Sequence, residues 1–345
     1  MDIIFRVDSS DTIGGGHLTR CINIANELKK RKINSYFICQ NLIGLDIKLL
    51  NKSLHKYKII PETNYFFDDA NETIKFIKER NIKPENIIVD HYELDANWEK
   101  LVKKYTRKLT VIDDLAHKKH YCDILINQVL GVETSKYKDL VPKNCKLFLG
   151  NEYIIMRPQF FIERNKLPNK IDFSNITDVH LFFSSNDNNG LTLKYTELFL
   201  KQFPEICIHL SLGNYFKDLE KLKELISKNK KIKWVQNNSN IEKQLSSCQI
   251  AIGTPGMMTW ERACMGIPSI QFGTKDFQDD ILEKLSKYGL CIWLGNEKYI
   301  DEKNFIKICR NFFEDKALLA EMRNKCLKTV DGKGIQRVID ILLDN

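Results

Sequence analysis

Residues 3–29 read IIFRVDSSDTIGGGHLTRCINIANELK, and this stretch decides the fold. Residues 3–7 form a short apolar run, which is typical of a buried β-strand. Residues 17–29 carry apolar side chains at helical spacing, and a glycine-rich loop joins the two segments. A strand, a tight loop and a helix in this order predict the first part of a βαβ unit with a parallel sheet.

The same alternation continues along the chain. Further strands are predicted at 34–39, 87–89, 109–112 and 124–126, with a helix near 72–80. A segment with Pro158 and Pro168 follows, and then a second series begins. Its predicted strands are 179–183, 207–212, 232–235, 250–252 and 269–272, and its helices include 218–228 and 257–264. The tail from 303 to 345 is expected to be helical, with a last stretch able to cross back onto the first domain.

We therefore predict an α/β protein of two Rossmann-like domains, because 345 residues exceed what one core usually fills. The first domain spans 1–158 and a linker spans 159–175. The second domain spans 176–330, and a C-terminal helix spans 331–345. No coiled-coil repeat is present, so we expect a monomer.

Composition excludes several classes of protein. The net charge of +8 comes from 53 Lys and Arg against 45 Asp and Glu, spread along the chain without an aromatic-interleaved basic patch. This pattern favours solvated surfaces over nucleic-acid binding. The ten cysteines form no CxxC pair and show no metal-ligand spacing with histidine, as expected for reduced thiols in the cytoplasm. The N-terminus does not resemble a signal peptide, and no apolar run reaches the length of a membrane span, so stable membrane insertion is not expected.

The loop after the first strand is the first candidate site, because ligands of open α/β sheets sit beyond the carboxyl ends of strands. Gly14, Gly15 and Gly16 let the backbone approach a ligand, and the following helix N-terminus offers N–H groups to an anion. His17 begins that helix, whose positive end favours a neutral imidazole able to accept a proton from water. The alternative is a histidine that caps a helix beside a structural turn. The loop is neither a P-loop nor a dinucleotide fingerprint.

Polar residues also follow other predicted strands. Asp90, His91 and Tyr92 follow the third strand, and Asp113 and Asp114 follow the fourth. Such clusters are expected where a cleft is built, although loop capping explains them equally well. Adjacent carboxylates on extended backbone point apart, which argues against a metal ion there.

A second glycine turn lies in the second half. Gly253, Thr254 and Gly256 separate the strand at 250–252 from the helix at 257–264, and this arrangement suits phosphate oxygens. Glu261 lies about one turn into the helix, where its carboxylate could accept hydrogen bonds from ribose hydroxyls. The alternative is that Glu261 only complements the helix dipole.

Together these motifs resemble the UDP-sugar hydrolases of pseudaminic acid biosynthesis, whose two-domain fold is the GT-B fold of glycosyltransferases such as MurG. The resemblance covers nearly the whole chain in order. The matching stretches are 6–8, 13–21, 89–92, 94–95, Trp98, 111–116, 122–123, 127–128, 149–150, 156–158, 260–262, 266–268 and 331–334.

The resemblance implies a GT-B arrangement with the active site in the cleft between the domains. It further implies that water attacks the anomeric carbon of UDP-2,4-diacetamido-2,4,6-trideoxy-β-L-altrose or a relative, with inversion and without a metal or other cofactor. His17 matches the family's catalytic histidine. The residues assigned to the substrate are Asp8, Gly14, Gly15, Gly16, Arg20, Asp90, His91, Tyr92, Asp113, Asp114, Asn127, Gln128 and Arg157. Those assigned to the nucleotide are Gly253, Thr254, Gly256, Met257, Met258, Thr259, Glu261 and Gln278.

Three stretches depart from the family pattern, all on the nucleotide side. They are Ser184-Ser185-Asn186-Asp187, the turn with Pro255, Met257 and Met258, and Phe277-Gln278. A different nucleotide, a different sugar and weakened nucleotide binding all fit these changes. Two other functions remain open: a GT-B glycosyltransferase with a sugar acceptor, and a non-catalytic protein that binds a sugar nucleotide.

Overall fold

The computed structural model describes residues 1–168, 170–184, 187, 189–213, 216–236 and 240–344. The chain forms two compact units, which are treated separately below. Unit 1 comprises Met1–Arg157 together with Lys333–Asn345, and unit 2 comprises Pro158–Gly332. The segment expected to be a linker, 159–175, lies within unit 2 and begins in helix α5 (Pro158–Arg164).

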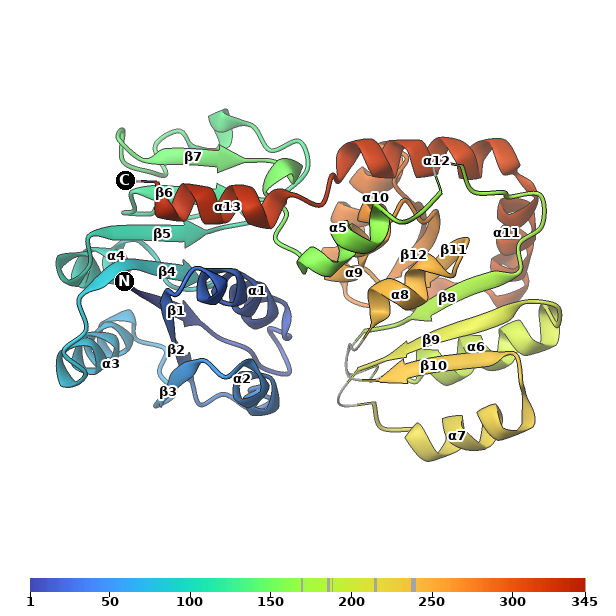
Figure 1. Cartoon of the computed structure of the whole chain (residues 1–345), viewed down its shortest axis with the longest axis horizontal. Coiled ribbons are helices and arrows are strands. Elements are labelled where there is room, and N and C mark those ends of the chain that lie inside the picture. The colour runs from blue at the N-terminus through green and yellow to red at the C-terminus, as the bar shows by residue number, and fades with distance from the viewer. Residues whose placement is uncertain (169, 185–186, 188, 214–215, 237–239, 345) are drawn as a thin grey trace. The chain divides into compact units, whose positions relative to one another are not determined.

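Unit 1 contains a parallel sheet of seven strands in the order β3-β2-β1-β4-β5-β6-β7 (Figure 1). Its strands are β1 Asp2–Val7, β2 Asn34–Gln40, β3 Lys56–Ile60, β4 Pro84–Asp90, β5 Lys108–Ile112, β6 Ile124–Asn127 and β7 Lys146–Leu149. Its α-helices are α1 Gly16–Lys30, α2 Ile47–Ser53, α3 Phe66–Glu79, α4 Ala96–Val102 and α13 Gly334–Leu343. The strand order reverses between β1 and β4, and such a switch point is where open α/β sheets bind ligands.

The apolar run of β1 is buried on both faces of the sheet. Ile3, Phe5 and Val7 pack into one core, to which α1 and α13 also contribute. Ile4 packs into a second core, to which α3 and α4 contribute. Successive strand residues point to opposite faces, so helices on both sides explain why four of the six β1 residues are apolar. The last helix, α13, contacts α1 within this unit.

Unit 2 contains a parallel sheet of six strands in the order β10-β9-β8-β11-β12-β13. Its strands are β8 Asp178–Phe182, β9 Cys207–Leu212, β10 Ile232–Gln236, β11 Ile250–Gly253, β12 Ser269–Gly273 and β13 Ile292–Asn296. Its other α-helices are α6 Leu191–Gln202, α7 Leu219–Lys228, α8 Ile241–Ser246, α9 Met257–Cys264, α10 Asp279–Lys287, α11 Glu302–Glu314 and α12 Lys316–Thr329. The strand order reverses between β8 and β11, so the loops after these strands lie at the second switch point.

The predicted strands are all present, and the predicted α/β class is confirmed. Three further strands, β3, β7 and β13, were not predicted from the sequence, and each lies at an edge of its sheet. The helix predicted near 72–80 begins earlier, at Phe66 in α3. Among the described residues, no helix has both the length and the apolar character required to span a bilayer.

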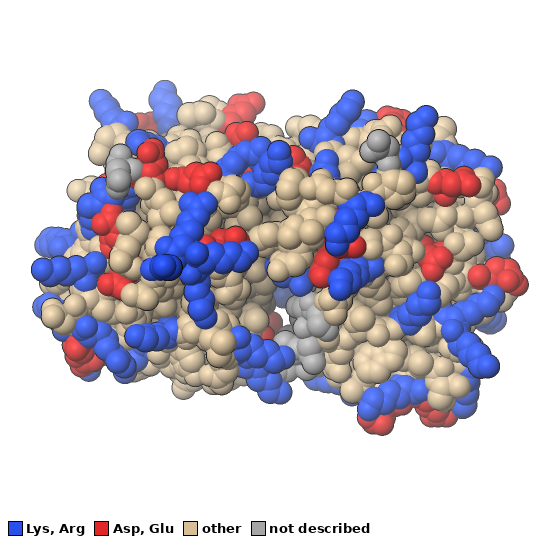
Figure 2. All heavy atoms as spheres, viewed as in Figure 1, with Lys and Arg blue, Asp and Glu red and all other residues tan. Residues whose placement is uncertain are grey.

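The charged side chains form no single basic patch on the face shown in Figure 2. Lys and Arg side chains are spread over this face, with acidic and uncharged residues between them. The distribution agrees with the spread of charge along the sequence, which contains 53 basic and 45 acidic residues.

Candidate functional site

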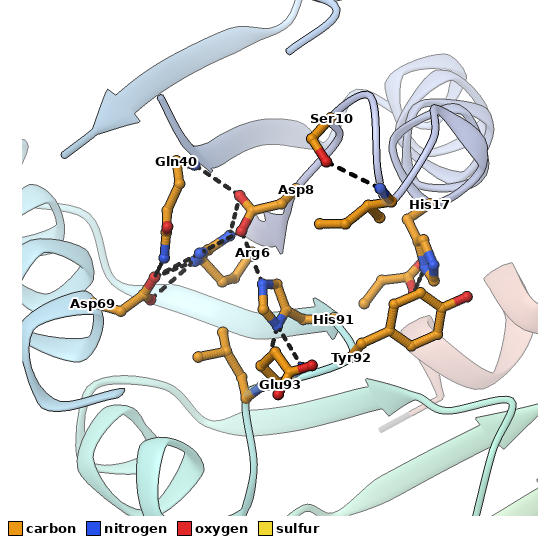
Figure 3. A network of polar contacts seen from close by, with 12 residues as sticks. Arg6, Asp8, Ser10, His17, Gln40, Asp69, His91, Tyr92 and Glu93 are labelled. Carbon is orange, nitrogen blue, oxygen red and sulfur yellow. Dashed lines mark hydrogen bonds and ion pairs between the residues drawn. The ribbon is translucent and has the colours of Figure 1, made fainter. Parts of the chain in front are cut away.

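The glycine-rich loop after β1 forms a tight turn in front of α1. The Gly14 N–H donates to the Ser10 carbonyl at 2.7 Å, and the Ser10 hydroxyl accepts from the Ile13 N–H at 3.0 Å (Figure 3). Gly14 has φ +83°, in the left-handed region that favours glycine. A Cβ atom at Gly15 or Gly16 would meet no atom within 4 Å. The loop is therefore open to an incoming group, and no side chain caps the N-terminus of α1.

His17 lies in the first turn of α1 and contacts Asp90 at the end of β4. The His17 Nδ1 and Asp90 Oδ1 atoms are 2.5 Å apart, and the Asp90 side chain is fully buried. This contact follows from the sheet order, because β1 and β4 are neighbours and both strands end at this edge. The ring of Tyr92 meets the His17 ring edge-on, with 4.5 Å between their centroids. Figure 3 shows Tyr92 beside the imidazole.

Arg20, one turn along α1, fixes the same carboxylate. Its Nε donates to Asp90 Oδ2 at 2.8 Å, and its Nη2 donates to Asp90 Oδ1 at 2.6 Å. Burial by itself would raise the pKa of Asp90, but the charges of Arg20 and His17 hold that pKa well below its usual range. Asp90 is therefore an anion. The proton of His17 is best assigned to Nδ1, because the Asp90 carboxylate, 2.5 Å from this nitrogen, can only accept a hydrogen bond. His17 Nε2 then carries the free lone pair.

A second buried network holds Asp8 at the end of β1. Arg6 donates from Nη1 and Nη2 to the two oxygens of Asp8, at 2.7 and 2.9 Å, and it also binds Asp69 on α3. His91 Nε2 lies 2.8 Å from the second Asp8 oxygen, while its Nδ1 accepts the Glu93 N–H at 2.9 Å. Burial lowers the pKa of His91, which keeps the ring neutral. Figure 3 shows Asp8 enclosed by these partners.

The residues after β5 and β6 form a third network. Asp113 accepts the N–H groups of Leu115 and Ala116, and the Tyr137 hydroxyl donates to it at 2.9 Å. His120 contacts Glu99 through Nδ1 at 2.7 Å. Its Nε2 lies 3.6 Å from Asp113, which is an ion-pair distance. Although burial opposes it, these two carboxylates raise the pKa of His120 to about 9.

The remaining residues assigned to the substrate differ in how open they are. Asn127 donates to the Tyr137 hydroxyl at 2.8 Å, and Gln128 accepts the Ile155 N–H at 3.0 Å, so both bind the chain itself. Arg20 Nη1 donates a hydrogen bond to Asp114 Oδ2 at 2.6 Å. Its other oxygen, Oδ1, is buried and has no hydrogen-bond partner among the described residues. Arg157 is partly buried at the end of the first segment of unit 1.

In unit 2, the turn between β11 and α9 combines tight packing with an open backbone. Gly253 has φ +157°, and an added Cβ would lie 1.8 Å from the Phe182 carbonyl oxygen. Gly256 has φ +125° and an open Cβ position, and no side chain caps α9. The Thr254 hydroxyl is buried without a hydrogen-bond partner among the described residues. These three residues lie at the switch point of the second sheet.

The other residues assigned to the nucleotide lie farther into the packed structure. Thr259 Oγ1 binds Gln271 at 2.7 Å, and the Gln278 side chain accepts the Thr274 N–H at 2.9 Å. Met258 and Glu261 are buried in α9, whereas Met257 is half-buried. Ser184 Oγ accepts the Asp187 N–H at 3.1 Å. Ser185, Asn186 and the Phe277 side chain lie outside the described residues.

Sequence reasoning missed several residues that support these sites. Arg6, Asp69, Glu99, His120 and Tyr137 were not singled out, although all five are buried or nearly so. Arg6 does leave a signal, because an arginine within an apolar strand must find buried carboxylates. The remaining four lie on helices and loops that are far apart in the sequence, so their contacts become apparent only in the folded chain.

No family model matches the chain. An uncharacterised protein of Methanocaldococcus jannaschii, MJ1062, is 28% identical over 296 residues, which cover 83% of this chain and 59% of that protein. The UDP-2,4-diacetamido-2,4,6-trideoxy-beta-L-altropyranose hydrolase of Campylobacter jejuni is 34% identical over 174 residues, which cover 50% of this chain and 58% of the hydrolase. Each of these alignments thus spans less than two thirds of the relative's length.

Two solved structures resemble the chain over their whole length. MurG of Acinetobacter baumannii has a TM-score of 0.70 at 12% identity, with 100% of this chain and 99% of that chain covered. The UDP-GlcNAc 2-epimerase of Neisseria meningitidis, solved with UDP-GlcNAc bound, has a TM-score of 0.61 at 13% identity, with both chains fully covered. The fold is therefore GT-B, with two parallel-sheet α/β domains, as predicted.

Proposed function

We propose that this chain hydrolyses a nucleotide-activated amino sugar, with His17 as the general base. The observation that carries the proposal is the His17–Asp90 pair, which stands at the switch point of the first sheet beside an open glycine loop. A histidine whose Nδ1–H is bound to a buried carboxylate has its Nε2 free to take a proton. Such a pair favours a role of His17 in acid–base chemistry over a role as a helix cap.

The proposed reaction is the displacement of a nucleoside diphosphate by water. A water molecule attacks the anomeric carbon while His17 Nε2 takes one of its protons. The bond between that carbon and the diphosphate oxygen breaks, and the nucleoside diphosphate leaves with the bonding electrons. The Asp90 anion stabilises the imidazolium that forms, and Arg20 keeps Asp90 ionised and oriented. A diphosphate is a stable anion, so it needs little help from an acid.

Unit 2 is proposed to bind the nucleotide through the turn at 253–256. The backbone there is open at Gly256, and the uncapped start of α9 offers N–H groups to phosphate oxygens. The Thr254 hydroxyl, buried without a partner among the described residues, supplies a donor. Substrate contact then requires both switch points to face one cleft, which stays a prediction for this chain.

The substrate class rests on the named relative. The Campylobacter protein is named as a hydrolase of a UDP-diacetamido-trideoxy sugar, and 174 residues of this chain are 34% identical to it. We propose the same or a closely related UDP-sugar as the substrate here. In unit 1, the Asp114 Oδ1 atom has no hydrogen-bond partner in the described part of the chain, and it is suited to accept an amide or hydroxyl hydrogen of such a sugar.

The test is to incubate the whole chain with this UDP-sugar in the absence of any acceptor. The proposal predicts stoichiometric release of UDP and a free reducing sugar. Release that depends on an added sugar acceptor would instead make the chain a glycosyltransferase, since Nε2 could equally take a proton from a hydroxyl. Binding of UDP without any release would make it a non-catalytic binding protein. UDP at about a hundred times its dissociation constant should add roughly 2.7 kcal/mol to stability, which a thermal-shift panel of nucleotides measures.

A further inference from the structure

Three potential metal ligands lie together in unit 2, away from the turn proposed for the nucleotide. They are Asp178 at the start of β8 and Cys207 and His209 at the start of β9, and one ligand atom from each lies within 4.8 Å of the others. The nucleotide turn follows the opposite, carboxyl end of β11 in the same parallel sheet. The cluster therefore belongs to a different edge of the unit.

The sheet register explains why these side chains meet. Asp178 is the direct cross-strand partner of Cys207 in the parallel pair β8–β9. Cys207 and His209 are two residues apart on one strand, so their side chains project from the same face. Three different ligand types thus share one face at one end of two neighbouring strands.

We propose that Asp178, Cys207 and His209 bind one zinc ion, with water as the fourth ligand. Zinc accepts thiolate, imidazole and carboxylate together, and its structural sites are tetrahedral. The hard oxygen-preferring ions Mg²⁺ and Ca²⁺ do not favour sulfur and nitrogen ligands. His209 is almost fully buried, while the Asp178 side chain is 25% exposed, which leaves a path for the ion and for water.

The histidine and carboxylate ligands require only a small adjustment of their separation. His209 Nε2 and Asp178 Oδ1 are now 2.7 Å apart, as a hydrogen-bonded pair. Tetrahedral ligation with Zn–N and Zn–O bonds of about 2.1 Å separates such atoms by about 3.4 Å, so the pair must open by about 0.7 Å. The Thr177 hydroxyl donates to the other Asp178 oxygen at 2.9 Å and orients the carboxylate from behind.

Lys233 on β10 is the cation that now approaches this cluster. Its Nζ lies 4.0 Å from Asp178 Oδ1, and its side chain is 62% exposed. Its register partner is His209 on β9. A bound zinc ion repels this ammonium group, which is free to swing into solvent. Lys233 therefore competes with the metal, and its removal should strengthen metal binding.

The experiment uses the full chain without an affinity tag, after removal of metal, and titrates it with Co²⁺ and Zn²⁺. The proposal predicts one equivalent of Co²⁺, with a thiolate-to-cobalt charge-transfer absorption that Zn²⁺ abolishes. Cys207→Ser should remove the charge-transfer band. His209→Asn should weaken Co²⁺ binding by at least about a hundredfold, because it removes a direct ligand and not only a residue that supports one. Lys233→Gln should bind Co²⁺ more tightly than the parent.

Matched controls are Cys145→Ser and His55→Gln, which alter a cysteine and a histidine of unit 1. Both should retain the full cobalt spectrum, and circular dichroism of the metal-free proteins should confirm that every variant is folded. The proposal is overturned if no metal binds, if the band survives in Cys207→Ser, or if Cys145→Ser removes it. Unchanged cobalt affinity in Lys233→Gln would also count against this placement of the ion.

Discussion

Asp90 accepts hydrogen bonds from Arg20 and contacts His17, so one buried carboxylate orients the imidazole and offsets the charge of the Arg20 guanidinium. None of this pairing is visible as a sequence motif, because Asp90 lies 73 residues from His17. The glycines and the strand end did predict that both residues would reach the same edge. The roles could not be predicted, because they depend on which nitrogen faces which oxygen.

Replacement of Asp90 by Asn tests the proposed orientation of His17. The amide keeps the size of the side chain but removes the charge, and it can hold the imidazole in the wrong tautomer. We expect kcat for nucleoside diphosphate release to fall by roughly 10²–10⁴-fold, the usual contribution of a positioned general base. Asp139→Asn is the matched control, because Asp139 is exposed and adopts a left-handed conformation that Asn tolerates. An unchanged kcat in Asp90→Asn, with the fold intact, would refute the pairing.

At the scale of single elements, sheet position decides what the sequence can predict. The central strands of both sheets are covered on both faces, so they are apolar runs that stand out. The strands β3, β7 and β13 lie at edges, and β3 reads Lys-Tyr-Lys-Ile-Ile, with alternating burial. Such strands resemble loops or partial helices in a single sequence. The helix N-termini were predicted within one residue for α1 and α9, because glycine turns precede both.

The loop that joins β5 to β6 should give the protein a characteristic dependence of stability on pH. Glu99 and Asp113 raise the pKa of His120 from 6.5 to about 9 despite its burial. The protonated histidine therefore adds stability in full below about pH 6.5, and this stability is lost as the pH rises through about 9. The rise of the pKa from 6.5 to about 9 corresponds to about 3–4 kcal/mol in total.

Urea unfolding at pH 6 and pH 9 measures this effect. His120→Gln should lose most of the difference in unfolding free energy between the two pH values, because the amide does not titrate. The parent should lose about 2–3 kcal/mol more than the variant over the same interval. Equal losses in parent and variant would show that other groups account for the pH dependence.

Helix α13, near the C-terminus, packs against α1, the helix that carries His17. Ile339 and Val338 are fully buried in the core that α1 also lines. We expect Ile339→Ala to cost about 2–5 kcal/mol of unfolding free energy, as for other large-to-small changes in cores. Gln336→Ala, at an exposed position of the same helix, should change stability by less than about 0.5 kcal/mol. Chemical denaturation compares the two, and similar small effects would place α13 outside the core.

At the scale of the whole molecule, two α/β units each present a glycine turn at the switch point of a parallel sheet. The alternation of strands and helices was sufficient to predict this architecture. The sequence could not predict which assigned residues remain open, because Asn127, Gln128 and Gln278 bind neighbouring backbone or side chains instead. The remaining candidates are fewer: the open glycine loops, the His17 imidazole, and the Thr254 hydroxyl and Asp114 Oδ1, which are buried without a hydrogen-bond partner among the described residues.

In the proposed function, unit 1 carries out the chemistry and unit 2 binds the nucleotide. The two roles can be tested separately. A His17 variant that loses UDP binding would point to a structural role for the histidine. A parent protein that binds no uridine nucleotide would instead undercut the assignment of the turn at 253–256, while the His17–Asp90 pair would be untouched.

The most direct measurement is therefore the acceptor-free rate of UDP release by the parent, His17→Ala and the control His55→Ala, with UDP affinity measured in all three. We expect His17→Ala to lose roughly 10²–10⁴-fold in kcat while its UDP affinity stays at the parent value, and His55→Ala to behave as the parent. Turnover by His17→Ala at the parent rate on the same UDP-sugar would contradict the role of His17 as the general base.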